Sequence, residues 1–167
     1  MRFSIGDLII YGETGVCRVD EIVEKEFLGE IRPCYKLQPL YQSCMIFTPA
    51  DNEAVFMRAI ITAAESNALI ESIPQIEPSV CKVTSPRELS DKYDKIIKLH
   101  DCTALISLIK SIHIKREQCI AAKKKLSAVD ERYMKRAEDL LFGELAASLS
   151  LEKANVKQYI EEKLAVR

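Results

Sequence analysis

Several features common in enzymes and membrane proteins are scarce in this sequence. No apolar run approaches the ~18 to 20 residues needed to span a bilayer, and the N-terminus is charged at Arg2 and Asp7 where a secretion signal is apolar. None of the five glycines belongs to a phosphate-binding loop, and neither of the two histidines, His100 and His113, adjoins a recognisable nucleophile. The sequence therefore predicts a cytoplasmic protein that is not an enzyme, with no membrane contact and no small-molecule substrate.

The six cysteines are dispersed singly along the chain. No C-x-x-C pair occurs, and no histidine stands at metal-ligand spacing. Isolated thiols of cytoplasmic proteins remain reduced and pack as small hydrophobic side chains. We expect no metal and no cofactor, and we expect this packing for Cys17, Cys34, Cys44, Cys81, Cys102 and Cys119.

Charge is uneven along the chain, although the net charge is only −1. Residues 1–66 hold 6 basic and 10 acidic side chains, whereas residues 67–167 hold 18 basic and 15 acidic ones. Within the second part, residues 82–136 hold 14 basic against 7 acidic side chains. This asymmetry permits a phosphate-facing surface on the second part only.

The first sixty residues have the pattern of short strands separated by turns. Asp7–Tyr11 is β-branched and apolar, and two glycines follow it in a tight-turn pattern. In the long run 16–27, apolar residues change parity near Ile22, which predicts a bulge or bend. Further strands are expected at 31–40, 43–48 and 55–61. Five short strands predict a small barrel, and periodicity does not separate an SH3-like or Tudor-like barrel from an OB fold.

Beyond Thr62 the apolar residues recur at helical spacing. The sequence predicts about five amphipathic helices, which follow the capping residues Thr62, Ser85, Asp101 and Ser127 or begin at Leu151. The proline-containing stretch 75–84 is expected to link the two halves. The predicted fold class is α+β, with an SH3-like or Tudor-like barrel over residues 1–66 and a helical domain over residues 67–167.

Three groups of residues together point to one family. Residues 3–16 read FSIGDLIIYGETGV, and Pro49-Ala50-Asp51-Asn52 is followed by Arg58. Residues 126–132 read LSAVDER, and residues 143–145 read GEL. In this order the groups resemble the CarD family of bacterial transcription regulators, whose N-terminal module is shared with the polymerase-interacting domain of the transcription-repair coupling factor.

The resemblance implies a Tudor-like barrel that docks on the RNA polymerase β subunit. It also implies a helical domain that contacts promoter DNA, without base preference, near the upstream edge of the transcription bubble. The polymerase-contact residues implied by position are Lys25, Phe27, Met45 and Phe47. The candidate DNA contacts are the basic residues Arg87, Lys92, Lys95, Lys115, Arg116, Lys123, Lys124 and Lys125.

Two departures from the family pattern leave alternatives open. Relatives commonly carry a tryptophan that wedges into the minor groove, whereas this chain has no tryptophan and Ser85-Pro86-Arg87 stands there. At Phe47 some relatives carry a basic residue. The resemblance implies a regulator that modulates the stability of the open promoter complex. The alternatives are a polymerase-binding adaptor without DNA contact, or a general nucleic-acid-binding barrel protein. Phe27, Met45 and Phe47 are equally interpretable as core residues, and the lysines as a solvated face.

Overall fold

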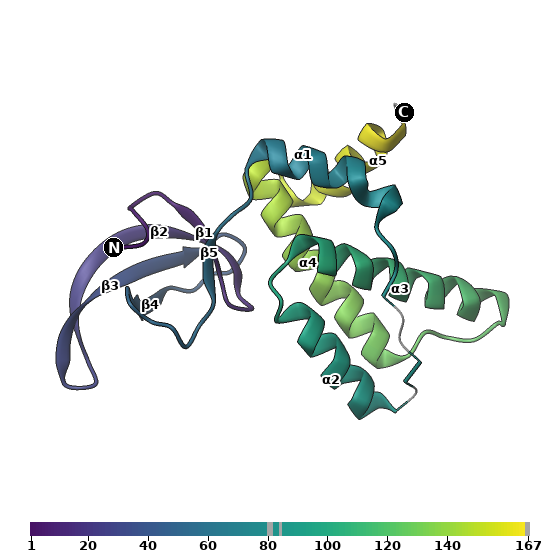
Figure 1. The fold of residues 1–167 in the computed structure, drawn as a ribbon, viewed down its shortest axis with the longest axis horizontal. Helices are drawn as coiled ribbons and strands as arrows, with labels where there is room; N and C mark the ends of the chain where they lie inside the picture. The colour runs from purple at the N-terminus through teal and green to yellow at the C-terminus, as the bar shows by residue number, and fades with distance from the viewer. Residues whose placement is uncertain (80–81, 84, 166–167) are drawn as a thin grey trace.

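The computed structural model describes residues 1–79, 82–83 and 85–165. Within these ranges a five-stranded antiparallel sheet is followed by five α-helices, which confirms the α+β prediction (Figure 1). The strands are β1 (Leu8–Tyr11), β2 (Gly15–Phe27), β3 (Glu30–Pro39), β4 (Ile46–Pro49) and β5 (Met57–Ala59). The α-helices are α1 (Ala63–Ser72), α2 (Pro86–Ile97), α3 (Cys102–Ala121), α4 (Ala128–Leu149) and α5 (Val156–Ala165).

The sheet has the strand order β4-β3-β2-β1-β5. Its longest strands, β2 and β3, form a hairpin closed by Leu28 and Gly29, whose φ angles are 54° and 83°. Positive φ at both turn residues matches the twist of the flanking strands. In the described pairings β4 and β5 are the edge strands, so closure of the sheet into a barrel stays a prediction.

The predicted parity change in β2 is confirmed as a shift in register. The pairing of β2 with β3 shifts between Val19 and Glu21, which leaves an extra residue on β2. Val19 pairs with the buried Leu37 before the shift, and Ile22 pairs with the buried Tyr35 after it. The bulge therefore keeps apolar side chains of β2 on the core face along the bend. That core comprises Phe3, Ile9, Cys17, Val19, Tyr35, Leu37 and Met57.

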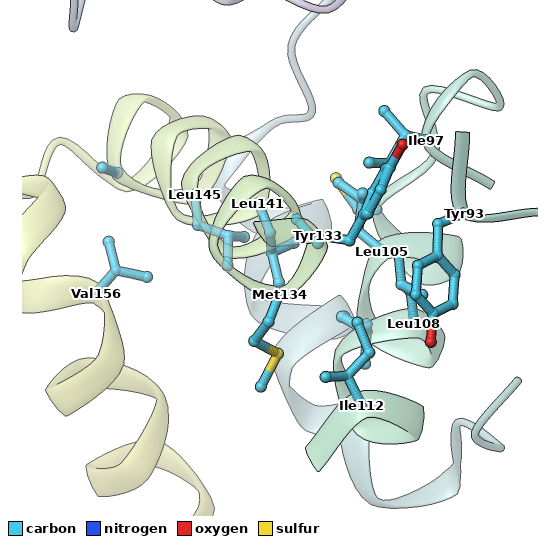
Figure 2. Packing of buried hydrophobic residues seen from close by; sticks show 14 of the residues in the cluster. Tyr93, Ile97, Leu105, Leu108, Ile112, Tyr133, Met134, Leu141, Leu145 and Val156 are labelled. Carbon is cyan, nitrogen blue, oxygen red and sulfur yellow. The ribbon is translucent and has the colours of Figure 1, made fainter. Parts of the chain in front are cut away.

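The helices enclose a second, larger core. Figure 2 shows its apolar side chains converging from α2, α3 and α4, with Val156 of α5 at one end. Tyr93 and Tyr133 pack ring against ring, with centroids 5.3 Å apart. Their hydroxyls donate to Asp130 and Asp94 at 2.5 and 2.6 Å, so both buried phenols are satisfied.

The stretch between α1 and α2 does not link the two halves, which corrects the prediction for residues 75–84. A 3₁₀ turn, η1 (Ile73–Gln75), follows α1, and Lys110 of α3 donates to the carbonyls of Ile73 and Ile76. The backbone N–H of Ser79 donates to Ser107 of α3 at 3.2 Å. Residues 73–79 therefore lie against α3, whereas residues 80, 81 and 84 fall outside the described ranges.

Helix α1 belongs to the helical part, because it packs against α4 and α5. The predicted boundary between residues 66 and 67 falls inside this helix. The chain passes from sheet to helices at residues 60–62, between β5 and α1. At the other end, α5 begins later than predicted, because a 3₁₀ turn, η2 (Lys153–Asn155), precedes it.

The predicted thiol packing is found for three cysteines, Cys17, Cys34 and Cys102, which are buried. Burial raises the pKa of Cys17 to about 12, with a smaller contribution from Cys44. Cys44 itself is exposed and Cys119 is half-buried, so the prediction was wrong for Cys44. Cys81 lies outside the described residues.

The N-caps provide a matched test of the helix starts. The Ser127 side chain accepts a hydrogen bond from the backbone N–H of Asp130, whereas Ser85 precedes α2 without a side-chain cap. Ser127→Ala should therefore lower the free energy of unfolding by ~0.5 to 2 kcal/mol. Ser85→Ala should change it by less, as measured by urea denaturation. Equal losses of unfolding free energy in the two variants would show that the side-chain hydrogen bond of Ser127 does not stabilise α4.

Candidate functional site

Three of the four predicted polymerase-contact residues share one face of the sheet. Lys25 and Phe27 are two residues apart on β2, so their side chains point to the same face. Lys25 pairs with Arg32 of β3, and alternate residues of β3, namely Arg32, Cys34 and Lys36, point to the same face. Lys36 in turn pairs with Phe47 of β4, so Phe47 points to the same face as Lys25. This face is opposite to the core face. We call Lys25, Phe27, Phe47 and the neighbouring Met45 the outer-face cluster.

The apolar members of the outer-face cluster are exposed. The exposed fraction is 44% for Phe27, 50% for Met45 and 39% for Phe47. The Lys25 ammonium lies 3.4 Å from the centroid of the Phe47 ring, a cation–π contact on the surface. The alternative that these apolar residues belong to the sheet core is therefore wrong.

The outer-face cluster adjoins an unpaired strand edge. The backbone N–H of Ala50 donates to Pro33 at 2.9 Å, and the register places Thr48 opposite Tyr35 in the same ladder. Hydrogen-bonded residues alternate along an antiparallel ladder, so the N–H and C=O of Phe47 point away from β3. Among the described strands none pairs with this side of β4, and the edge can accept a strand from a partner.

The predicted DNA contacts fall into two environments. The Lys115 side chain is half-buried, and its ammonium contacts the Tyr93 hydroxyl at 2.8 Å and the Asp130 carboxylate at 3.2 Å. Arg116 lies 3.5 Å from Glu131. The remaining candidates are exposed: Arg87, Lys92 and Lys95 on α2, and Lys123, Lys124 and Lys125 between α3 and α4. A DNA role for all eight residues stays a prediction.

A buried ion pair joins the sheet to the helices. Arg58 of β5 donates to both carboxylate oxygens of Glu144 in α4, at 2.6 and 2.9 Å. The Glu144 side chain is only 2% exposed. Its oxygens also accept from the backbone N–H of Ile61 at 3.0 Å and from the Cys102 thiol at 3.1 Å. Four hydrogen bonds from three residues thus satisfy one buried carboxylate where the chain leaves the sheet.

The protonation states at this ion pair follow from the same geometry. Burial acts to lower the pKa of Arg58, but the hydrogen bonds and charge of Glu144 outweigh it and the pKa is raised. Burial, and then the charge of Glu144, raises the pKa of Cys102, so the thiol keeps its proton and donates it. Burial and the charge of Arg58 lower the pKa of His100, whose carbonyl accepts from Arg58 at 2.9 Å.

A close contact in the same junction requires a glycine on α4. The Tyr41 hydroxyl donates to the Gly143 carbonyl at 2.8 Å. A Cβ at Gly143 would lie 2.9 Å from the Tyr41 ring, closer than side chains tolerate. Nearby, Arg136 of α4 pairs with Glu13 of the β1–β2 turn at 2.5 Å. Both contacts fix the position of α4 against the sheet.

Sequence reasoning did not identify this junction as a site. Arg58, Gly143 and Glu144 were singled out only as parts of separate motifs, and 86 residues separate the two charges. The one usable signal was that Arg58 in one motif and Glu144 in the other carry charges of opposite sign. Nothing in the spacing showed that the two would meet.

The described residues contain no group of three or more potential metal ligands. Among them, none of the helices has the length and apolar composition required to cross a bilayer.

Residues 3–61 match the family model of the CarD-like/TRCF RID domain. This segment is similar to a CarD-like/TRCF RID domain. The match covers all five strands and ends directly before the Thr62 cap of α1, which confirms the resemblance for this part of the chain. The RID is an RNA-polymerase-interacting domain and belongs to a family of interaction modules. A search of curated proteins found no match to the chain.

The buried ion pair should contribute far more to stability than an exposed one. Arg58→Met would leave the Glu144 carboxylate buried without its cation, and loss of one partner typically costs ~3 to 5 kcal/mol. The control is Arg18→Met, because Arg18 pairs with Asp20 at 2.6 Å while 49% exposed. Exposed pairs contribute ~0 to 1 kcal/mol. Urea denaturation of both variants measures the difference, and similar losses would contradict this role of Glu144.

Proposed function

We propose that this protein is a cytoplasmic bacterial transcription regulator that docks on the RNA polymerase β subunit through its RID. The observation that carries the proposal is the exposed outer-face cluster beside the free edge of β4, within a segment that matches the RID family. An edge strand supplies backbone hydrogen bonds to a partner strand, and flanking side chains supply specificity. We also propose that the curved sheet is a Tudor-like barrel. Residues 1–66 would then bind polymerase, and residues 67–167 would approach DNA.

The helical part is proposed to approach promoter DNA. Its support is the excess of 14 basic over 7 acidic side chains in residues 82–136 and the exposure of Lys123, Lys124 and Lys125. Such contacts neutralise phosphates and read no bases. The protein would then shift the equilibrium between closed and open promoter complexes by the difference in its affinity for the two.

A polymerase-binding adaptor without DNA contact is the second candidate. Two observations favour it over the first: the chain has no tryptophan to wedge into DNA, and Lys115 and Arg116 already have acidic partners. The third candidate, a general nucleic-acid-binding barrel, would bind bare duplex without polymerase. Tight, salt-dependent binding to bare duplex favours this candidate, whereas the first candidate binds bare duplex only weakly and the adaptor does not bind it.

The outer-face cluster should be needed for polymerase binding but not for folding. Lys25→Glu with Phe27→Ala should weaken binding to the β subunit at least tenfold, because a few central residues supply most of the energy of an interface. A matched control is Lys157→Glu with Ile114→Ala, since Ile114 is 44% exposed, like Phe27, and Lys157 is exposed.

Binding is measured by surface plasmon resonance and folding by thermal melting. The melting temperature should fall little, because truncating a half-exposed ring costs less than the ~3 to 5 kcal/mol of a buried Phe. Equal affinity for the double variant and the control would remove the outer-face cluster from the docking surface.

DNA binding should depend on the lysines between α3 and α4. Charge reversal at Lys123, Lys124 and Lys125 should lower affinity equally on promoter and random duplex, and flatten the salt slope by up to ~1 per lost contact. Fluorescence anisotropy at several salt concentrations measures both quantities. Reversal at Lys153, Lys157 and Lys163 near the C-terminus is the control. Unchanged DNA binding and unchanged promoter effects in the first variant would favour the adaptor.

A further inference from the structure

A cleft lies where the sheet meets α4. One wall is formed by residues 13–16, at the turn from β1 to β2, and by Tyr41 and Gln42 after β3. The other wall is formed by α4 and by Lys153 of η2. The volume of this junction cleft is about 400 Å³, within the ~300 to 1,000 Å³ of most small-molecule sites. None of the described residues that line it belongs to the outer-face cluster or to the Arg58–Glu144 ion pair.

Helix α4 presents a basic face to the junction cleft. Arg132, Lys135 and Arg136 all line it, and because they are three and four residues apart, their side chains share one side of the helix. Gly143, about two turns further along α4, continues this side and contacts Tyr41 of the opposite wall. The contact that fixes α4 against the sheet therefore also fixes the basic face toward the cleft.

The junction cleft holds more cations than carboxylates. Its four basic side chains are those of Arg132, Lys135, Arg136 and Lys153, and its two acidic ones are those of Glu13 and Asp139. Both carboxylates are already bound, Glu13 by Arg136 at 2.5 Å and Asp139 by Lys153 at 3.3 Å. Among the described residues, Arg132 and Lys135 have no carboxylate at ion-pair distance. Two positive charges thus stay uncompensated at one small space.

A phosphorylated ligand suits this excess of charge. A terminal phosphate carries about two negative charges at neutral pH, and a guanidinium beside an ammonium supplies donors for its oxygens. One phosphate does not fill the cleft, whose wall also includes the Tyr41 ring, 41% exposed. The Lys153 ammonium lies 4.9 Å from the centroid of that ring. The cleft therefore combines cations with an aromatic surface on which a flat base can pack.

We propose that the junction cleft binds a nucleotide, whose phosphates contact Arg132, Lys135 and Arg136 and whose base lies against Tyr41. A small ligand is favoured over a DNA backbone, because two turns and a helix enclose the space and a duplex is too wide to enter it. The bound nucleotide would contact the sheet and α4 together and so stabilise their junction. This inference goes beyond the proposed function and does not depend on polymerase docking.

Isothermal titration calorimetry of the full-length chain tests the site. ATP should bind more tightly than pyrophosphate, and inorganic phosphate should bind most weakly. Arg132→Gln with Lys135→Gln should weaken ATP binding about tenfold or more, because both changes remove charged donors. Saturating ATP should raise the melting temperature of the native chain but not of this double variant.

The matched control is Arg87→Gln with Lys157→Gln. Both residues are exposed and lie outside the junction cleft, so the same total charge is removed elsewhere. ATP affinity should stay within about twofold of the native value. Without ligand, the melting temperatures of both double variants should be close to that of the native chain, because exposed substitutions change stability little.

A gain of affinity is expected in Glu13→Gln. Glu13 and the phosphates would compete for Arg136, so removal of the carboxylate should strengthen ATP binding about threefold or more. The Glu13 side chain is 42% exposed, and the loss of its ion pair should cost little stability. A purely structural role for Arg136 predicts no gain. Unchanged or weaker binding would remove Arg136 from the site.

The Tyr41 ring distinguishes a nucleotide from a simple phosphate. Tyr41→Leu should weaken ATP binding about fivefold or more, because stacking on the ring is lost, and should leave pyrophosphate binding unchanged. Tyr41→Phe keeps the ring but loses the hydrogen bond to Gly143, and it should retain the preference for ATP. If pyrophosphate binds as tightly as ATP, or if Tyr41→Leu weakens both equally, the ligand is not a nucleotide.

Two further outcomes would overturn the site itself. The first is a native chain that binds none of the three ligands, or a control that loses as much affinity as Arg132→Gln with Lys135→Gln. The second is binding of a short DNA duplex that depends on Arg132 and Lys135 while ATP does not bind. That result would assign the basic face of α4 to DNA phosphates.

Discussion

The arrangement of the molecule depends on one buried ion pair. Glu144 lies inside the helical part, almost without exposure, and its carboxylate is stable there because Arg58 binds both oxygens while Ile61 and Cys102 donate the remaining hydrogen bonds. Arg58 belongs to β5, one of the two edge strands of the sheet. The ion pair thereby directs the β5 side of the sheet toward α4 and leaves β4, at the opposite edge, available to a partner (Figure 1).

Local chemistry predicted the elements well, and contacts between distant residues were predicted poorly. The parity change in β2 and the caps at Thr62, Asp101 and Ser127 depend only on neighbouring residues, and each is found in the structure. The stretch 75–84 was misassigned as the link between halves because prolines mark an irregular segment and not what it connects. The hydrogen bonds from α3 that hold this stretch come from more than 25 residues away.

The candidate sites show the same division between local pattern and tertiary contact. Alternation along β2 could place Lys25 and Phe27 on one face, but could not determine whether that face is buried. Their exposure follows from the bulge after Val19, which keeps Ile22 on the core face and so turns Val23, Lys25 and Phe27 outward. Likewise, a count of lysines could not reveal that Lys115 is satisfied by Asp130 and Tyr93, because a basic cluster in sequence contains both structural and exposed charges.

The junction between sheet and helices also constrains how the two proposed contacts, one with polymerase and one with DNA, could cooperate. Arg58 of β5, Tyr41 of the turn after β3 and Glu13 of the β1–β2 turn each bind α4. Gly143 leaves no space for a side chain between α4 and Tyr41. With a flexible link, the helical part of a polymerase-bound protein would search for DNA, and linker length would set its effective concentration at the DNA. With a fixed junction, the effective concentration of the helical part is high at one distance and angle from the docked sheet and almost zero elsewhere. A regulator of this form would therefore favour whichever promoter state presents its DNA at that position, and loosening the junction would weaken this preference while leaving polymerase docking intact.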